Sequence, residues 1–457
     1  MMHRFFGVMG AAVLVSLSGA HEATASVRGA GGMDAPLDVT ALLTAAHGAP
    51  PMICALAAQS VRNYGWSDWS DAPYTPLATS SPLRGRDGGS SALPAEDVAR
   101  LLDALASPDG CVRELSIRLL GGQRNEVPIA AALVTRLSSG DASMREIAAF
   151  GLGMIAPANA VSPLITALHD ATPSVRANAA WALGRIDDGR ALGDIVGLFR
   201  DADEKVRVAA VVAAGRIDSV STVAALMRVL QQDDSPSVRR VAAWALGQKD
   251  AREAAAVLAT TLAKEPDARV REMVAWALGN TRGAAGVAAL TSAVRRDADD
   301  NVRETAAWAL AEMRDRTAVE VLGTVAGDDH SSRVRGTAAW ALGELRTSGE
   351  KAPPGLLKAL RDESEDTRLK AAWALGQIGD PAVLDAIRDA LKTEKGSKVG
   401  KALVRALIKS GGRSEETLTQ LLSSSDPTVR EAAVRGLAGS DSFNPWPWPW
   451  PRPRPFP

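Results

Sequence analysis

The stretch Ala-Ala-Trp-Ala-Leu-Gly at residues 179–184 decides the fold, because it recurs along the chain. Further copies stand at 242–247, 338–343 and 371–376, with near copies at 274–279 and 306–311, the last ending in Ala311. Neighbouring copies are mostly 32 residues apart, as for Trp244 and Trp276. Self-similarity at a fixed period of this length is typical of stacked repeat proteins.

A Val-Arg pair precedes the phrase and fixes the register of the repeat. It stands at Val175-Arg176 and Val270-Arg271, for example, and its variants mark eleven units from about 95 to 440. Neither helix of such a unit can bury its apolar face alone, so neighbouring units must share one core.

Each unit is expected to contain two helices. In 160–186 an apolar helix face ends at Asp170, and Thr172 before Pro173 then marks a new helix start. Glycine at the end of the phrase is expected to end the second helix in the left-handed conformation. The glycines concerned are Gly153, Gly184, Gly215, Gly247, Gly279, Gly343 and Gly376. The expected fold is an all-α, right-handed solenoid of about eleven two-helix repeats.

The repeat resembles a known family. Val-Arg-x-x-Ala-Ala-x-Ala-Leu-Gly, with Asp six residues before the Arg, is similar to the HEAT-like repeat of phycobiliprotein lyases and to the consensus of designed HEAT-like binding libraries. The resemblance implies an Asp–Arg ladder between neighbouring units. Its acids would be Asp170, Asp201, Asp233, Asp297, Asp329 and Asp362, and its bases Arg176, Arg207, Arg239, Arg303, Arg335 and Arg368.

The repeated tryptophans are expected on the face of the second helix opposite its core residues. At 100° per residue, Trp lies at 240° when the preceding Val lies at 0°. One interpretation is a Trp-lined concave surface that binds a partner, since exposed Trp is costly unless covered. The other is that each Trp packs on the neighbouring repeat. The row comprises Trp181, Trp244, Trp276, Trp308, Trp340 and Trp373.

Charged residues share the face predicted for these tryptophans. Arg185, Arg216 and Arg240 make its early part basic. Glu272, Glu304, Glu312 and Glu344 make its middle part acidic. A bipolar surface of this kind favours a protein or peptide partner with its own charge pattern, although solvated surface charge would give the same pattern.

The N-terminal region has the pattern of an exported protein. Residues 1–25 are expected to be a signal peptide, with His3 and Arg4 before an apolar run, which favours a periplasmic or secreted protein of bacterial type. An uncleaved membrane anchor is the alternative. Residues 26–64 are expected to form a degenerate helical cap, 65–93 a flexible loop, and 94–440 the repeats.

Cys54 and Cys111 are the two cysteines of the chain. In an oxidising compartment they could pair in a disulfide. Because each lies near the start of an apolar helix, two buried thiols remain the other arrangement.

Residues 441–457 are expected to be a disordered tail rich in Pro and Trp. Alternating Pro favours an extended polyproline conformation. Three interpretations stay open: a recognition segment that binds Trp-lined grooves, including those of this chain itself; a membrane-surface contact; and a tail without function. The recognition residues would be Trp446, Trp448, Trp450, Arg452 and Arg454.

The sequence favours a binding scaffold over an enzyme. With 52 basic and 53 acidic residues it has no general electrostatic attraction to nucleic acid. We expect no catalytic residue, metal site or cofactor, because none of the known short motifs is present. The alternatives are a carbohydrate or cell-wall binder that uses Trp as a stacking platform, and a HEAT-family enzyme such as a bilin lyase or a deoxyhypusine-hydroxylase-like oxidoreductase.

Overall fold

The computed structural model describes residues 37–60, 93–123, 126–345, 351–411, 419, 421–425 and 427–437. All regular secondary structure in these ranges is helical. The expected signal segment 1–25 and tail 441–457, and residues 61–92, lie outside them. Within the described ranges, no helix combines the length and apolar character that a bilayer crossing requires. The chain divides into two compact units, Met1–Ile186 (unit 1) and Asp187–Pro457 (unit 2).

The described part of unit 1 has two leading helices followed by three helix pairs. The leading helices are α2 (Val39–Ala46) and α3 (Pro51–Ser60). The pairs are α4 (Ala95–Ala104) with α5 (Gly110–Gly121), α6 (Glu126–Arg136) with α7 (Ala142–Ile155), and α8 (Val161–Ala167) with α9 (Pro173–Ile186).

The leading helices are fastened to the first pair at two places. Cys54 on α3 and Cys111 on α5 form a disulfide with Cα atoms 5.6 Å apart. The backbone N–H of Gly48 donates to the Asp109 carboxylate at 2.7 Å, and Asp109 also caps the start of α5. Of the two arrangements that the sequence leaves open for the cysteines, the structure has the disulfide.

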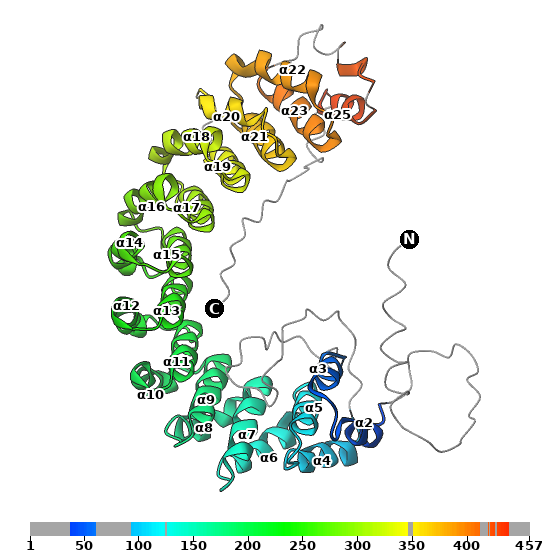
Figure 1. The fold of residues 1–457 in the computed structure, drawn as a ribbon, viewed down its shortest axis with the longest axis vertical. Coiled ribbons are helices and arrows are strands. Elements are labelled where there is room, and N and C mark those ends of the chain that lie inside the picture. The colour runs from blue at the N-terminus through cyan, green and yellow to red at the C-terminus, as the bar shows by residue number, and fades with distance from the viewer. Residues whose placement is uncertain are drawn as a thin grey trace, which may run out of the picture. The chain divides into compact units, whose positions relative to one another are not determined.

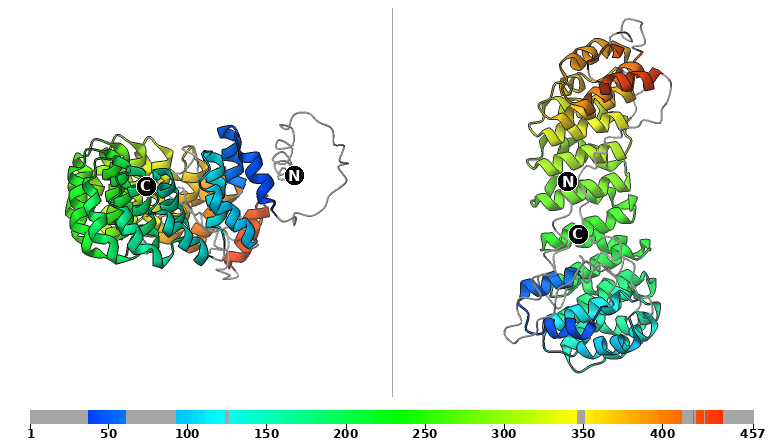
Figure 2. Two further views of the ribbon diagram at one scale, coloured as in Figure 1. Left: turned by 90° about the horizontal axis from the view of Figure 1, so that it is seen from below. Right: turned by 90° about the vertical axis from the view of Figure 1, so that its right-hand side faces the viewer.

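Unit 2 continues the same alternation. Its pairs are α10 (Leu192–Gly197) with α11 (Glu204–Arg216), α12 (Val223–Gln232) with α13 (Pro236–Gln248), α14 (Ala255–Lys264) with α15 (Ala268–Thr281), α16 (Ala285–Arg296) with α17 (Asp300–Glu312), α18 (Val319–Asp328) with α19 (Ser332–Glu344), α20 (Pro354–Ala359) with α21 (Glu365–Ile378), and α22 (Leu384–Thr393) with α23 (Ser397–Lys409), followed by α25 (Pro427–Leu437). The second helices of the pairs form the inner layer and the first helices the outer layer (Figure 1). Neighbouring helices stack side by side in each layer (Figure 2), which confirms the expected all-α solenoid.

The second helices begin at short polar side chains. Asp267 accepts hydrogen bonds from the backbone N–H groups of Arg269 and Val270 at the start of α15, and Asp299 does the same at the start of α17. Ser235, followed by Pro236, caps α13. These caps satisfy N–H groups that have no partner inside the helix, and so they fix where each second helix starts.

The expectation that the phrase glycines end these helices is wrong. Helix α13 continues past Gly247 to Gln248, and α15 continues past Gly279 to Thr281. The left-handed residues at helix ends are others, such as Ala156 and Arg282. The glycines instead leave space for the neighbouring repeat, as the contacts of the tryptophans below show.

Arginine side chains tie each repeat to the next, as the resemblance implies. Arg207 Nε donates to the Asp233 carboxylate at 2.9 Å, and its Nη1 donates to the Asp201 carbonyl oxygen of its own repeat at 2.9 Å. The described pairs are Arg145–Asp170, Arg207–Asp233, Arg239–Glu265, Arg271–Asp297, Arg303–Asp329, Arg335–Asp362 and Arg368–Glu394. Glu265 and Glu394 take the place of Asp, so a search for Asp alone misses them. The Arg145 guanidinium holds the pKa of the Asp170 carboxyl below its usual value.

Candidate functional site

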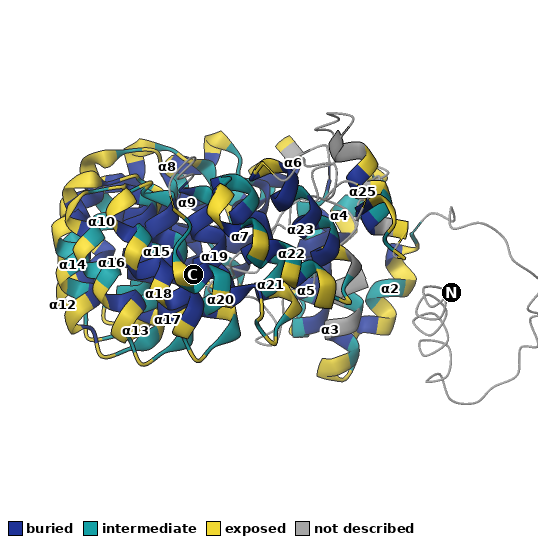
Figure 3. Ribbon diagram, turned by 90° about the horizontal axis from the view of Figure 1, so that it is seen from above, coloured by how far each residue is buried: buried dark blue, intermediate teal, exposed yellow. Residues whose placement is uncertain are grey.

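The second helices leave one narrow face incompletely covered. On α15 the core residues are buried, while Arg269 is exposed and Glu272, Trp276 and Asn280 are half-buried. These four residues are three and four positions apart, so they lie on one helix face. The inner layer is otherwise largely buried, as the colouring of Figure 3 shows. The predicted grouping of Trp with the flanking charged positions on one face therefore holds for α15.

Four tryptophans of the row are buried, which agrees with the interpretation that each Trp packs on the neighbouring repeat. The exposed fractions are 1% for Trp181, 7% for Trp244, 7% for Trp340 and 6% for Trp373. Trp276 on α15 and Trp308 on α17 are half-buried. A carbohydrate binder that stacks sugars on the Trp row would need exposed indole faces, and four of the six tryptophans do not offer them.

Five of the tryptophans pack against the glycine of the preceding repeat, while Trp340 follows a repeat that has Ala311 at that position. A Cβ atom built on Gly153 would lie 2.1 Å from Cζ3 of Trp181, and one on Gly343 would lie 2.2 Å from Cζ3 of Trp373. The same approach, at 2.6 to 3.2 Å, joins Gly215 to Trp244, Gly247 to Trp276 and Gly279 to Trp308. A bulky aromatic side chain opposite a residue without a side chain fills the gap between repeats. The Trp row is thus mainly an inter-repeat contact.

The basic candidates are partly used in such contacts. In unit 1, Arg185 Nε donates to the carbonyl oxygen of Gly153 at 2.6 Å, and its guanidinium lies 5.4 Å from the Trp181 ring centroid. Trp181 also stacks on Phe150. Arg216 and Arg240 belong to unit 2, where both are half-buried.

The acidic candidates lie on three consecutive second helices of unit 2, and they differ in their partners. Glu304 is buried on α17, and its Oε2 atom lies 3.0 Å from Nη1 of Arg333. Its Oε1 accepts a hydrogen bond from the Thr337 hydroxyl at 3.3 Å. Glu312 and Glu344 are half-buried at the ends of α17 and α19.

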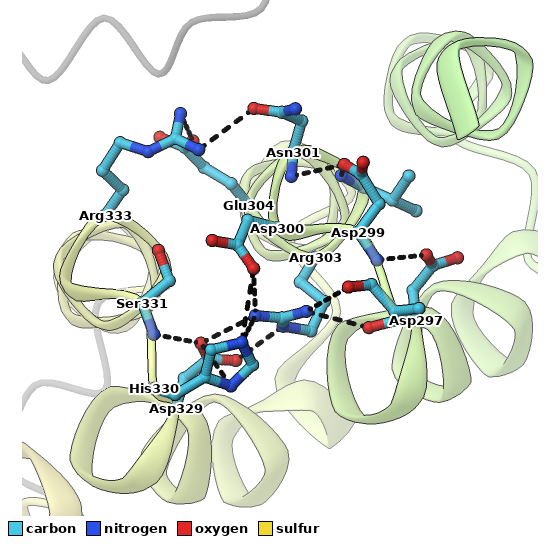
Figure 4. Close-up of polar contacts among 12 residues, drawn as sticks. Asp297, Asp299, Asp300, Asn301, Arg303, Glu304, Asp329, His330, Ser331 and Arg333 are labelled. Carbon is cyan, nitrogen blue, oxygen red and sulfur yellow. Dashed lines mark hydrogen bonds and ion pairs between the residues drawn. The ribbon is translucent and has the colours of Figure 1, made fainter.

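Burial raises the pKa of the Glu304 carboxyl above its ordinary value. The positive charges of Arg333 and Lys370 oppose this rise. Figure 4 shows Arg333 reaching from the start of α19 to Glu304 and Asn301. Glu304 is therefore held by one cation and one hydroxyl, both from the following repeat.

Glu272 has the same place on α15 but no such partners. Its side chain makes no ion pair or hydrogen bond with any residue that the structure describes. Burial raises the pKa of its carboxyl, the carboxylates of Asp299 and Glu304 raise it further, and Arg240 and Arg333 lower it. A half-buried carboxylate that forms no ion pair favours the approach of a cationic group.

The difference follows from the register of the repeats. The residue before the repeat Val reaches the acid of the preceding repeat, and this residue is Arg333 beside Glu304 but Asn301 beside Glu272. Asn301 instead accepts a hydrogen bond from Arg333 at 3.1 Å. Thr305 matches Thr337 in the register, yet its buried hydroxyl has no hydrogen-bond partner in the described residues.

We call Glu272, Trp276 and Asn280 of α15, with Glu304 and Trp308 of α17, the α15–α17 patch. It combines the two less buried tryptophans of the row with an unpaired carboxylate. The buried Nδ2 atom of Asn280 also lacks a hydrogen-bond partner in the described residues. The patch can offer indole surface, a negative charge and an amide donor to one ligand.

The sequence does not single out Asn301 or Arg333. Both precede the repeat Val, at a position that the expected binding face omits. Aligning the repeats by that Val shows which residue of the next repeat corresponds to Arg333 for each acid.

The sequence also does not predict the further contacts of Arg303, whose Nη2 atom lies 2.6 Å from Asp300 and 2.8 Å from His330 Nε2 (Figure 4).

No group of three or more His, Cys, Asp or Glu side chains within the described ranges is placed to hold a metal ion. The acidic candidates of unit 2 are instead distributed over α15, α17 and α19. Their spacing suits contact with an extended ligand better than coordination of one ion.

Comparison with known structures finds similar helical folds. Importin beta is similar with a TM-score of 0.59 and 16% identity, over 87% of this chain and 64% of that chain. An engineered protein (TM-score 0.42, 25% identity, covering 75% of this chain and 98% of that one) and the Escherichia coli protein YibA (TM-score 0.44, 21% identity, 56% and 93%) are also similar. A search of curated proteins finds no match.

The family model of HEAT repeats matches this chain five times. The matched residues are 130–196, 194–279, 223–299, 287–360 and 353–438, which together run from 130 to 438 of the 457 residues. The matches cover the helix pairs from α6 onward, including the α15–α17 patch. The chain belongs to the HEAT-repeat family.

Proposed function

We propose that this chain is a non-enzymatic scaffold that binds a basic, extended segment of a protein at the α15–α17 patch. HEAT-repeat solenoids are protein-interaction folds, so the coarse role follows from the family. The observation that carries the finer proposal is Glu272, a half-buried carboxylate that forms no ion pair or hydrogen bond with the described residues and whose pKa is raised by burial.

The chemistry of the patch selects the kind of partner. An Arg or Lys side chain would pair with Glu272 through a charge-assisted hydrogen bond. The neighbouring indole of Trp276, one helical turn away, can attract the same cation through its ring face. An extended segment suits the patch because its side chains can contact α15 and α17 in turn, whereas a folded surface needs a broad area.

A direct binding measurement tests this proposal. A fluorescein-labelled peptide of alternating Arg and Pro is titrated with the full-length chain carrying Arg452→Glu/Arg454→Glu, so that the basic C-terminal segment of the chain does not compete, and the anisotropy is followed. Glu272→Gln removes one charge-assisted contact, so we expect the affinity to fall by about tenfold, or ~1.4 kcal/mol.

Two further variants make the test specific. Asn301→Arg should weaken binding as strongly, because it supplies Glu272 with the cation that Glu304 already has. The double variant Glu253→Gln/Glu320→Gln removes two exposed charges on the outer layer and should leave binding unchanged. An affinity insensitive to Glu272→Gln and Asn301→Arg contradicts the proposal.

We also propose that the protein works in an oxidising compartment outside the cytoplasm. The signal-like segment 1–25 and the Cys54–Cys111 disulfide both support this location. Protein taken from its native cells and alkylated before reduction should show no modification of Cys54 or Cys111. Full alkylation of both cysteines without reduction would place the protein in a reducing compartment.

A further inference from the structure

We infer that residues 445–457 of this chain are an internal ligand of the α15–α17 patch, bound by the same molecule and competing with outside partners. The inference rests on the proposed function, since it names an occupant for that same patch. The segment lies outside the described residues, so the argument uses its sequence and the geometry of the patch.

The charge and composition of the segment match the patch. Residues 445–457 contain Arg452 and Arg454 and no acidic residue. The half-buried Glu272 side chain forms no ion pair with the described residues, and burial and nearby carboxylates raise the pKa of its carboxyl. An arginine guanidinium can pair with a carboxylate through two hydrogen bonds and can stack on an indole. Proline rings pack well against aromatic side chains, and Trp276 and Trp308 are the two less buried members of their row.

The length of chain is sufficient for binding within one molecule. Helix α25 ends at Leu437, and four steps between neighbouring second helices separate α25 from α17. At about 8–10 Å per step these amount to roughly 32–40 Å. Fifteen residues lead from Leu437 to Arg452. At about 3.1 Å per residue in a polyproline conformation they span roughly 47 Å, so Arg452 can reach α17 and approach α15.

A ligand tethered in this way raises the threshold for other partners. Its effective concentration near the patch is set by the tether and is on the order of millimolar for a flexible linker. An outside basic segment must therefore displace it. The consequence is a patch that is covered when no partner is present, which also shields its half-exposed tryptophans.

The test compares full-length proteins that differ only in the charge of the segment. The labelled Arg-Pro peptide is titrated into the wild-type chain, into Arg452→Glu/Arg454→Glu, and into the matched control Arg452→Lys/Arg454→Lys. We expect charge reversal to increase the affinity for the peptide by about tenfold, because the tethered competitor is lost. The Lys control keeps the positive charges but loses the two-hydrogen-bond pairing and the stacking, so its affinity for the peptide should lie between those of the wild type and the charge-reversed chain.

Combined variants assign the effect to the patch. In a Glu272→Gln background, charge reversal of the segment should change peptide affinity by less than about twofold, since both ligands have lost the same contact. The reduction in peptide affinity that the segment causes in the wild-type chain should also be independent of protein concentration. A block that grows with protein concentration would show binding between molecules and overturn the inference.

The outcomes separate this inference from the proposed function. If the peptide binds the wild-type and charge-reversed chains equally and needs Glu272 in both, the patch binds basic segments and the internal ligand is refuted. If the peptide binds neither chain, the proposed function fails and the inference fails with it.

Discussion

The α15–α17 and α17–α19 junctions carry glutamates at equivalent positions, yet these side chains have different environments. Glu304 is paired with Arg333 and accepts from Thr337, so its charge is used within the solenoid. Glu272 has Asn301 in the place of Arg333, and it has no partner in the described residues. At the next junction Gly336 replaces the acid, and Lys370 pairs with Asp366 instead. Small changes at one register position thus convert a structural contact into a surface that can bind.

The largest effect expected is on the tryptophan contacts. Trp373→Ala removes a buried indole that leans on Gly343, so it should cost about 3–5 kcal/mol of unfolding free energy. Trp276→Ala, in the half-exposed patch, should cost less, about 1.5–3 kcal/mol. Denaturant unfolding followed by circular dichroism measures both. Equal losses would mean that Trp276 is as much a part of the core as Trp373.

Replacing the glycines that face these tryptophans should also cost more stability at the tighter contact. An added Cβ on Gly343 lies 2.2 Å from the Trp373 ring, whereas on Gly279 its nearest contact is the Cβ of Ala309 at 2.9 Å. Gly343→Ala should therefore destabilise the protein by about 1–3 kcal/mol, and Gly279→Ala by less. The thermal unfolding of the two variants decides the order. The reverse order would contradict the tighter fit at α19–α21.

The two glutamates should differ in their contribution to stability. Glu304→Ala leaves the Thr337 hydroxyl and Arg333 without their acceptor and should cost about 1 kcal/mol. Glu272→Ala should change stability by less than about 0.5 kcal/mol. Denaturant midpoints of both variants measure this difference. A loss at Glu272 as large as that at Glu304 would reveal a structural role for Glu272 and weaken its assignment to binding.

The smallest effect expected is the pH dependence of Glu272. Its pKa is raised in the folded protein, so the folded state binds a proton more tightly than the unfolded chain does. Ionised Glu272 therefore lowers stability at neutral pH, and this penalty disappears as the pH falls through the folded pKa toward the ordinary value of 4.5. Glu272→Gln should raise the melting temperature at pH 7.5, and the gain should shrink at pH 4.5. A constant difference would exclude titration of Glu272 as its cause.

The opposite dependence is expected for the ladder acids. The pKa of Asp170 is lowered by its hydrogen bond with Arg145, and that of Asp362 is also lowered, with Arg335 as its partner. Their contribution to stability is present above the unfolded pKa and is lost as the pH falls through the folded pKa. A fall in pH therefore weakens the ion pairs between repeats, while it removes the destabilising effect of ionised Glu272.

The sequence predicts the fold and the Asp–Arg pairs between neighbouring repeats well, because both depend on residues that recur along the chain. The helical wheel also places Trp276 on the same face as Glu272 and Asn280. It does not predict how far each indole is covered, because that depends on the neighbouring repeat and on the space left by glycines such as Gly247. The role of these glycines was misassigned for the same reason, since a helix end and a close contact both favour glycine.

The contrast between Glu272 and Glu304 could be read from the sequence only after the register was known. The deciding residues, Asn301 and Arg333, stand 29 positions after the acids that they accompany. No local motif connects residues so far apart, and only the stacking of repeats brings them together. The Cys54–Cys111 pairing likewise needed the geometry of α3 against α5.

The contact of a Trp with the glycine of the preceding repeat has a consequence for how such a chain can change in length. A repeat such as that of α13 or α15 offers a glycine to its successor and an indole to its predecessor, so a duplicate of it would meet a matching neighbour on both sides, whereas Val212 replaces the Trp in α11 and Ala311 replaces the glycine in α17. Gain or loss of whole units needs no compensating substitution at the new junction. The series stops at α23, where Arg405 stands at the Trp position and Gly376 faces the backbone of Ala406. That unit also has Ile408 at the glycine position, so a repeat that carries Trp would find no glycine to pack against if it followed α23.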